Sequence, residues 1–270
     1  MIIEKLTLFC VLFFFSSRVM LSQSDKGGAD RALYILSVFA KIERPVTVAE
    51  LITLTGLPQS TLYRQLTLLK KWGFVFESQG QYMPGPGCLP LAWGFSQSSF
   101  LLQHARRDML TLSTQTGESV GILVALDAMA VCLDMVESTN SLRCSFVKGR
   151  SLPLIRGASA KSLLAFLPAA KQQVIVQEAV QQNLLTGTQA EQLAADLRQI
   201  QQQGFAVSEG EVDDGVWGVS APLFQHKRIA LGSITLMAPT ARALPRSQQL
   251  IDATVKAAAN ISTTLKALLI

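Results

Sequence analysis

Apolar residues along the N-terminal third of the chain recur first at helical spacing and then at strand spacing. Residues 30–40 fit a helix with Asp30 as its N-cap and Leu33 on its buried face. Thr47-Val48-Ala49-Glu50 is a capping box, in which the threonine hydroxyl and the glutamate carboxylate each satisfy a backbone amide at a helix start. The pattern therefore predicts one helix over residues 30–40 and a second helix that begins at Thr47.

A third helix is expected after a turn at Gly56. Glycine tolerates the positive φ that ends a helix in a sharp turn, and the next helix can then begin near Pro58. Leu62, Leu66 and Leu69 recur at i, i+4 and i+7, which is the spacing of a buried stripe. A helix, a glycine turn and a further helix in this order are typical of a helix-turn-helix.

Polar side chains occupy the other faces of this third helix. Arginine and glutamine can form paired hydrogen bonds with base edges, and serine, threonine and backbone amides suit phosphate oxygens. Between Pro58 and Phe74 the charged residues are Arg64, Lys70 and Lys71, with no acid, so the helix is locally cationic. The side chains that this reasoning assigns to a nucleic-acid groove are Gln59, Ser60, Thr61, Tyr63, Arg64, Gln65 and Thr67.

Two short β-prone runs follow the third helix. Phe74–Glu77 and Gly80–Met83 enclose a turn at Ser78-Gln79-Gly80, and we interpret them as a hairpin wing that lies along phosphates. A three-helix module can also serve protein contacts alone. The capping box, turn glycine, cationic helix and wing occur together and in order, which favours a DNA-binding winged helix-turn-helix over residues 22–84.

From Asp30 to Leu269 the sequence resembles the IclR family of bacterial transcriptional regulators. The resemblance is carried by Asp30–Leu36, Val48–Leu51, Thr55–Arg64 and Gly73–Val75. It implies a repressor that binds double-stranded operator DNA, with a sequence-reading helix in the major groove. The residues predicted to contact DNA are Arg31, Thr47, Gln59, Ser60, Thr61, Tyr63, Arg64 and Lys70.

An apolar linker helix is expected after the wing, over residues 85–101. The Pro-Gly-Pro-Gly segment at 84–87 breaks the chain, and Leu91, Trp93 and Phe95 then make the following helix more apolar than a free surface helix. Packing against a second copy, or against the C-terminal domain, would cover these side chains. A homodimer would also present two reading helices to successive major-groove faces, and the resemblance implies a dimer or a tetramer.

Residues 102–270 predict an α+β domain in which helices flank a sheet, and the resemblance implies a GAF-like α/β effector-binding domain. A helix to Gln115 is followed by two strands joined by an Asp127-Ala128 turn. A later helix is expected to begin at Thr188 with Glu191 in the capping-box position. The strands are expected at Val120–Leu126, Met129–Val136, Leu142–Lys148, Val216–Phe224 and Ile229–Met237.

A pocket is expected where the small-residue segment Leu152–Lys161 meets the start of a helix. Free amides at a helix N-terminus can hold a carboxylate, but Ser159 could equally well do no more than cap its helix. The resemblance favours a site for a small organic acid or sugar acid. Family members often carry an acid in place of Ser208 and a serine in place of Met237, so the identity of the ligand does not carry over. The implied effector contacts are Ala158, Ser159, Ser208, Gly218, Thr235 and Met237.

Composition narrows the function classes further. The length of 270 residues suits two domains, and the net charge of +5 is compatible with a polyanionic partner without requiring one. Four scattered cysteines, together with His104 and His226, argue against a zinc site and against histidine catalysis. Ser159 lacks the lysine three residues later that SxxK chemistry uses, Gly218–Pro222 falls one residue short of GxSxG, and HExxH and phosphate-loop motifs are absent. We therefore expect no enzyme and no cofactor, although an enzyme stays an alternative. We interpret the acids of 209–214 as a solvated loop and not as a metal site.

The N-terminus resembles the charged and hydrophobic regions of a secretory signal peptide, because Lys5 precedes the apolar run Leu6–Phe15. This run is shorter than the about 20 apolar residues of a membrane span. We interpret residues 1–19 as an extension upstream of a natural start at Met20, and we expect a cytoplasmic regulator. A membrane-tethered regulator is the alternative.

Overall fold

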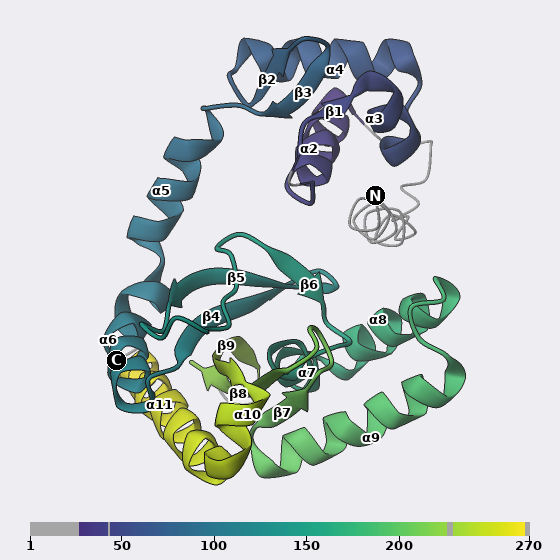
Figure 1. The fold of residues 1–270 in the computed structure, drawn as a ribbon. Helices are drawn as coiled ribbons and strands as arrows, with labels where there is room; N and C mark the ends of the chain where they lie inside the picture. The colour runs from purple at the N-terminus through teal and green to yellow at the C-terminus, as the bar shows by residue number, and fades with distance from the viewer. Residues whose placement is uncertain (1–26, 43, 226–228, 268–270) are drawn as a thin grey trace. The chain divides into compact units, whose positions relative to one another are not determined.

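The computed structural model describes residues 27–42, 44–225 and 229–267. The chain divides into two units between Gln97 and Ser98, and each unit is described by itself (Figure 1). The predicted extension 1–19, the first residues of the predicted reading domain and His226 lie outside the described residues. None of the described helices combines the length and the hydrophobicity that crossing a membrane requires.

Three helices form the body of the first unit. They are α2 (Gly28–Phe39), α3 (Val48–Thr55) and α4 (Gln59–Lys71). Leu62, Leu66 and Leu69 are buried in their shared core, as the leucine spacing predicted. The predicted helix-turn-helix is therefore confirmed.

Local capping chemistry fixes the start and the end of α3. The Glu50 amide donates to the Thr47 hydroxyl at 3.3 Å, and the Thr47 amide donates to the Glu50 carboxylate at 2.8 Å. Hydrogen bonds from Arg44 and Thr47 lower the pKa of the Glu50 carboxyl. Gly56 ends the helix with a φ of +66°, so both the predicted capping box and the predicted turn glycine are confirmed.

Two expectations for the first helix are wrong. The helix begins at Gly28, and Asp30 is its third residue, where the carboxylate accepts the Gly27 amide at 3.2 Å. Leu33 is 65% exposed because the buried face runs through Ala32, Ile35, Val38 and Phe39. In a short helix with many apolar residues, the spacing is compatible with more than one buried face. Packing against the other helices decides which face is buried.

The wing is a two-residue hairpin. β2 (Val75–Ser78) and β3 (Gln81–Pro84) pair antiparallel, and both turn residues, Gln79 and Gly80, have left-handed backbone with φ of 50° and 73°. Such a turn matches the twist of the strands that it joins. The hairpin is confirmed, and an unpredicted short strand, β1 (Val46–Thr47), adds to it in the order β1-β3-β2.

The Pro-Gly-Pro-Gly segment packs backbone against backbone before α5 (Cys88–Ser98) begins. The Gly85 and Gly87 amides donate to the Phe74 and Gly73 carbonyls, both at 2.8 Å. A Cβ at Gly85 would come within 2.3 Å of the Gly73 oxygen, so only glycine fits there. The expected apolar helix is present, and the predicted linker boundaries of 85–101 stay a prediction.

The second unit is a six-stranded antiparallel sheet in the order β6-β5-β4-β9-β8-β7, with helices on both faces (Figure 1). One core lies between the sheet and α6 and α11, and a second core lies between the sheet and the layer formed by α7, α8 and α9. The α+β prediction is confirmed. The strands are β4 (Ser119–Leu126), β5 (Met129–Val136), β6 (Ser151–Pro153), β7 (Ala206–Glu209), β8 (Val216–Phe224) and β9 (Ala230–Pro239).

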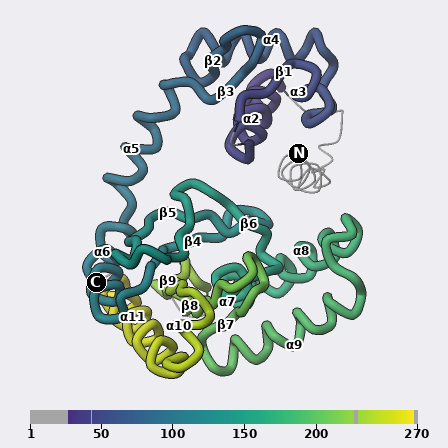
Figure 2. The backbone as a smooth tube through the Cα atoms, viewed as in Figure 1, coloured from purple at the N-terminus to yellow at the C-terminus, as the bar shows by residue number. Residues whose placement is uncertain are grey.

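The helices of this unit differ in how they lie on the sheet. Figure 2 shows α8 and α9 as a long antiparallel pair, whereas α7 lies directly on the strands. A short helical link between β9 and α11 completes the unit. The helices are α6 (Phe100–Thr116), α7 (Ala158–Ala165), α8 (Ala169–Gln181), α9 (Gly187–Gln203), α10 (Thr240–Ala243), η1 (Leu244–Arg246) and α11 (Ser247–Ala267).

Two expectations for the second unit are wrong. Residues 142–148 form a loop, and the strand that pairs with β5 on the side away from β4 is the short β6, at Met129–Val131. The helix expected to start at Thr188 is capped at Thr186, with Gln189 completing the capping box in place of Glu191. Glutamine at this position makes the same reciprocal bond as glutamate.

Candidate DNA-binding surface and candidate ligand pocket

Helix α4 presents one exposed polar face opposite its buried leucines. Arg64 lies on this face, and within the described chain its guanidinium has no hydrogen bond or ion pair. A free guanidinium can therefore bind an outside partner. The exposed polar residues recur at i, i+1, i+4, i+5 and i+8: Gln59, Ser60, Tyr63, Arg64 and Thr67.

The other residues predicted to contact DNA are partly buried or form hydrogen bonds and ion pairs within the protein. Arg31 and Thr61 are half-buried, and Thr61 lies at the margin of the exposed face of α4. The Thr47 hydroxyl is used in the capping box. Lys70 forms an ion pair with Glu77 of the wing, which raises the pKa of the lysine and ties α4 to β2.

Gln65 was assigned to the groove-reading face, and this is wrong. It is 3% exposed and lies on the same side of α4 as Leu62 and Leu69. The leucine spacing leaves position 65 inside the buried arc, because 65 follows 62 by three residues and precedes 69 by four. The helical repeat therefore predicted that Gln65 is buried, whereas its residue type suggested contact with DNA bases.

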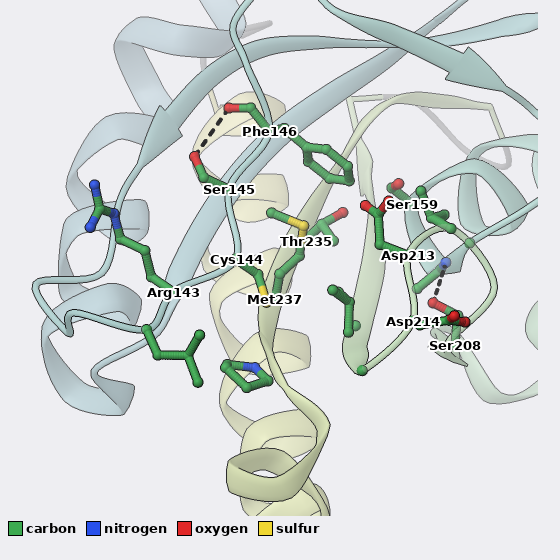
Figure 3. A pocket seen from close by; sticks show the side chains of 18 residues that line it. Arg143, Cys144, Ser145, Phe146, Ser159, Ser208, Asp213, Asp214, Thr235 and Met237 are labelled. Atoms are coloured by element: carbon green, nitrogen blue, oxygen red, sulfur yellow. Dashed lines mark hydrogen bonds between the residues drawn. The ribbon is translucent and has the colours of Figure 1, made fainter. Parts of the chain in front are cut away.

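A cavity of about 390 Å³ lies at the start of α7 (Figure 3). Its walls come from the start of α7, one face of β7, β8 and β9, and two loops over residues 142–146 and 212–215. The structure brings all the predicted effector contacts to this cavity: Ala158, Ser159, Ser208, Gly218, Thr235 and Met237. Neither loop was predicted to take part.

The strand register explains why distant residues meet here. Ser208 on β7 pairs with Gly218 on β8, which pairs with Met237 on β9. Directly paired residues point to the same face of a sheet, and Thr235 lies two residues before Met237 on that face. Because Gly218 has no side chain, it leaves room between Ser208 and Met237.

The start of α7 supplies hydrogen-bond donors to the cavity. Gly157 is the N-cap with a φ of +82°, so the alternative that Ser159 caps its helix is wrong. The Ala158 amide donates to the Ser208 hydroxyl at 2.9 Å, drawn as a dashed line in Figure 3. Within the described chain, the amides of Ser159 and Ala160 and the Ser159 hydroxyl have no hydrogen-bond partner. Ser159 lines the cavity and is 2% exposed, so its donors face the cavity and not bulk water.

Two family models match the sequence. The IclR helix-turn-helix domain matches residues 28–77. The bacterial transcriptional regulator IclR C-terminal domain matches residues 96–263, which is more than half of the chain. The chain belongs to the IclR family of bacterial transcriptional regulators.

Individual relatives agree with this assignment. The HTH-type transcriptional regulator RhmR of Escherichia coli (strain K12) is 31% identical over 225 residues, covering 81% of this chain and 85% of RhmR. The transcriptional repressor IclR of the same organism is 27% identical over 221 residues, covering 78% and 80%. An IclR transcriptional regulator from Silicibacter sp. TM1040 has a crystal structure with a TM-score of 0.79 at 24% identity, covering 89% of this chain and 96% of that one. This IclR-family protein is therefore a DNA-binding transcriptional regulator and not an enzyme.

A buried lysine next to the cavity escaped the sequence reasoning. The Lys161 ammonium lies 2.6 Å from the Glu211 carboxylate and 3.2 Å from the Asp196 carboxylate. Glu211 also accepts the Gly157 amide at 3.0 Å, so this cluster fastens the 210–215 loop to α7. A lysine within a run of alanine, serine and leucine was the available signal, because such a run is usually buried.

We expect Lys161→Met to destabilise the second unit by about 1–2 kcal/mol. The variant keeps the apolar stem and leaves two carboxylates without their cation, but these carboxylates are about one-third exposed and regain water, which lowers the cost. Urea unfolding measures the change. Lys171→Met on the exposed face of α8 is the matched control. Equal unfolding midpoints for the two variants would show that the Lys161 cluster does not stabilise the fold.

Proposed function

We propose that this regulator is a repressor that binds operator DNA as a homodimer or homotetramer and releases it when a small carboxylate binds the cavity at α7. The single observation that carries the ligand is the set of unpartnered donors of Ser159 and Ala160 at a helix start. The relative IclR is a repressor, which supports the same sign of regulation here. A protein that binds the chromosome is also expected in the cytoplasm.

The exposed face of α4 supports the DNA part of the proposal. Gln59, Tyr63 and Arg64 would reach base edges, while Ser60 and the wing would lie along phosphates. Among the other predicted contacts, Arg31 can reach the phosphate backbone from α2, and Lys70 can do so once it leaves Glu77. Contacts with phosphates make the affinity fall as salt rises.

The apolar surface of α5 supports self-association. Leu89, Leu91 and Trp93 are 76%, 65% and 70% exposed, which is costly for a helix surrounded by water. A second copy of the chain would cover them and pair two α4 helices. Whether the final assembly is a dimer or a tetramer is measured by sedimentation.

The test of the proposed function is a titration of the purified protein with its own promoter, with and without small organic acids and sugar acids. We expect at least one acid to weaken promoter binding, because a ligand shifts an equilibrium by its different affinity for the two states. Acids that bind and leave DNA affinity unchanged would contradict the regulation. A protein that ignores its promoter at low salt would contradict the operator assignment.

We expect Gly218→Val to reduce the affinity for such an acid about tenfold, or ~1.4 kcal/mol, and to leave DNA binding unchanged. The added methyl groups would fill the space between Ser208 and Met237. A lone Cβ at Gly218 meets the Ser208 oxygen at 3.6 Å and the Ala158 Cβ at 3.8 Å, which are ordinary contact distances. Gly218→Ala is therefore the control that keeps most of the cavity. Calorimetric titration of both variants measures the effect, and equal affinities would remove this wall from the site.

A further inference from the structure

The 212–215 loop brings two carboxylates, those of Asp213 and Asp214, to the wall of the cavity. In Figure 3 the Asp213 side chain points toward Ser159 at the start of α7. Its loop is held by backbone hydrogen bonds, from the Val216 amide to the Asp213 carbonyl at 3.2 Å and from the Thr240 amide to the Gly215 carbonyl at 2.8 Å. The position of Asp213 is therefore a property of the folded unit.

The negative charge of Asp213 acts on Cys144 in the opposite wall of the cavity. Burial raises the pKa of the Cys144 thiol, the charge of Glu118 raises it further, the charge of Arg242 opposes this rise, and the charge of Asp213 adds a smaller upward contribution. Cys144 belongs to the 142–146 loop, which faces the 212–215 loop across the cavity. Asp213 thus acts on the cavity and not only on the solvent outside it.

No cation of the cavity wall neutralises Asp213. Within the described chain, Asp213 takes part in no ion pair and no side-chain hydrogen bond. Arg143 is the only lysine or arginine among the described residues that line the cavity. It donates to Glu137 at 3.1 Å, and its guanidinium points away from Ser159 in Figure 3. Because Asp213 is exposed and unpaired within the described chain, its carboxylate is free to accept a hydrogen bond from a ligand.

This geometry restricts what the ligand carries next to its carboxylate. A carboxylate held by the donors of Ser159 would face Asp213, and the two like charges would repel each other even though the Asp213 side chain is also open to water. A hydrogen-bond donor between them removes the conflict, because a hydroxyl or an ammonium donates to Asp213 in a charge-assisted bond. A keto oxygen in the same place is only an acceptor and adds to the repulsion.

We propose that the effector is a carboxylic acid with a hydroxyl or amino group on the carbon next to the carboxylate, and that Asp213 selects this group. The inference rests on the proposed ligand site at α7. The proposal excludes two classes of acid as preferred ligands when acids of the same size are compared. These are 2-keto acids and acids with no substituent next to the carboxylate. Sugar acids of the aldonic type belong to the accepted class, because they carry a hydroxyl on that carbon.

The test is calorimetric titration of the full-length protein with five named acids. Lactate and gluconate carry the hydroxyl, alanine carries the amino group, pyruvate carries a keto oxygen, and propionate carries neither. We expect at least one of the first three to bind at least tenfold more tightly than pyruvate and propionate. A preference for lactate and gluconate would identify a hydroxy acid, and a preference for alanine would identify an amino acid.

Two variants separate Asp213 from the general charge of its loop. Asp213→Asn keeps the size of the side chain and supplies both a donor and an acceptor, so the tenfold preference should fall to threefold or less. Glu209→Gln removes one charge from the same acidic segment but does not line the cavity, so the preference should be retained. Both side chains are exposed, and equal melting temperatures would show that the fold is intact.

Three results would overturn the inference: pyruvate or propionate binding as tightly as the other acids, an unchanged preference in Asp213→Asn, or no binding by any of the five. Promoter binding measured alongside keeps the two proposals apart. Asp213-dependent binding of a hydroxy or amino acid without any change in DNA affinity would refute the regulation alone. Promoter release by pyruvate would refute the selection by Asp213 and leave the regulation standing.

Discussion

Replacing Arg64 with alanine is expected to weaken binding to the operator about tenfold to a hundredfold and to blur its sequence preference. A guanidinium that bonds a base edge through two hydrogen bonds contributes about 1–3 kcal/mol of discrimination. Arg64 is exposed on α4 and has no partner within the described chain, so its loss should not disturb the fold. Fluorescence anisotropy with operator DNA and with scrambled DNA measures both effects.

Arg198→Ala is the matched control for this experiment. Arg198 is an exposed arginine on α9, in the unit that does not carry the helix-turn-helix, so the variant loses the same charge elsewhere. An equal loss on operator and scrambled DNA would move Arg64 from base reading to phosphate contact. Two unchanged titrations would remove Arg64 from the interface altogether.

The reading unit was predictable because its signals are local. The capping box of Thr47 and Glu50, the turn at Gly56 and the two-residue hairpin each involve neighbours within four residues, and backbone chemistry alone fixes their geometry. The start of α2 was missed because its cap is the Gly27 backbone, and glycine gives no side-chain signal. Gln65 was misplaced because its residue type suited base contacts, although its helical position is buried.

The pocket was only half predictable. Its floor follows from small residues at the start of α7 and from the family resemblance, and the strand register then brings Ser208 and Met237 together. The loops that close it depend on contacts across many residues, such as Lys161 with Glu211, which are 50 apart in sequence. The run Leu142–Lys148 was predicted to be a strand. In the fold these residues form a loop, and every residue from 142 to 146 lines the cavity.

The second large effect is expected from Glu118, whose carboxylate is completely buried. It accepts two hydrogen bonds from Arg242, at 2.6 and 2.8 Å, and also pairs with Arg246. Arg246 donates to the Thr116 carbonyl at 2.9 Å, and Arg242 donates to the Leu142 carbonyl at 3.0 Å. One carboxylate thus joins the end of α6, the α10–η1 segment and the loop that covers the cavity.

We expect Glu118→Ala to lower the free energy of unfolding of the second unit by about 3 kcal/mol. Removing one partner of a buried ion pair usually costs about 3–5 kcal/mol, and the low end applies because both arginine side chains are 31% exposed and can regain water. Urea unfolding followed by circular dichroism measures the change. Glu178→Ala on the exposed face of α8 is the control, with an expected change within about 0.5 kcal/mol.

Glu118→Gln separates the charge from the hydrogen bonds. The amide oxygen can still accept from Arg242, so the loss should be smaller than for alanine, while Arg246 loses its counter-charge. Since Arg242 also holds the Leu142 carbonyl, both variants should loosen the 142–146 loop and weaken binding of whichever acid the cavity accepts. If Glu118→Ala is clearly destabilised but binds the ligand with unchanged affinity, the loop closes the cavity without this anchor. If its unfolding midpoint equals that of Glu178→Ala, the buried carboxylate contributes nothing to stability.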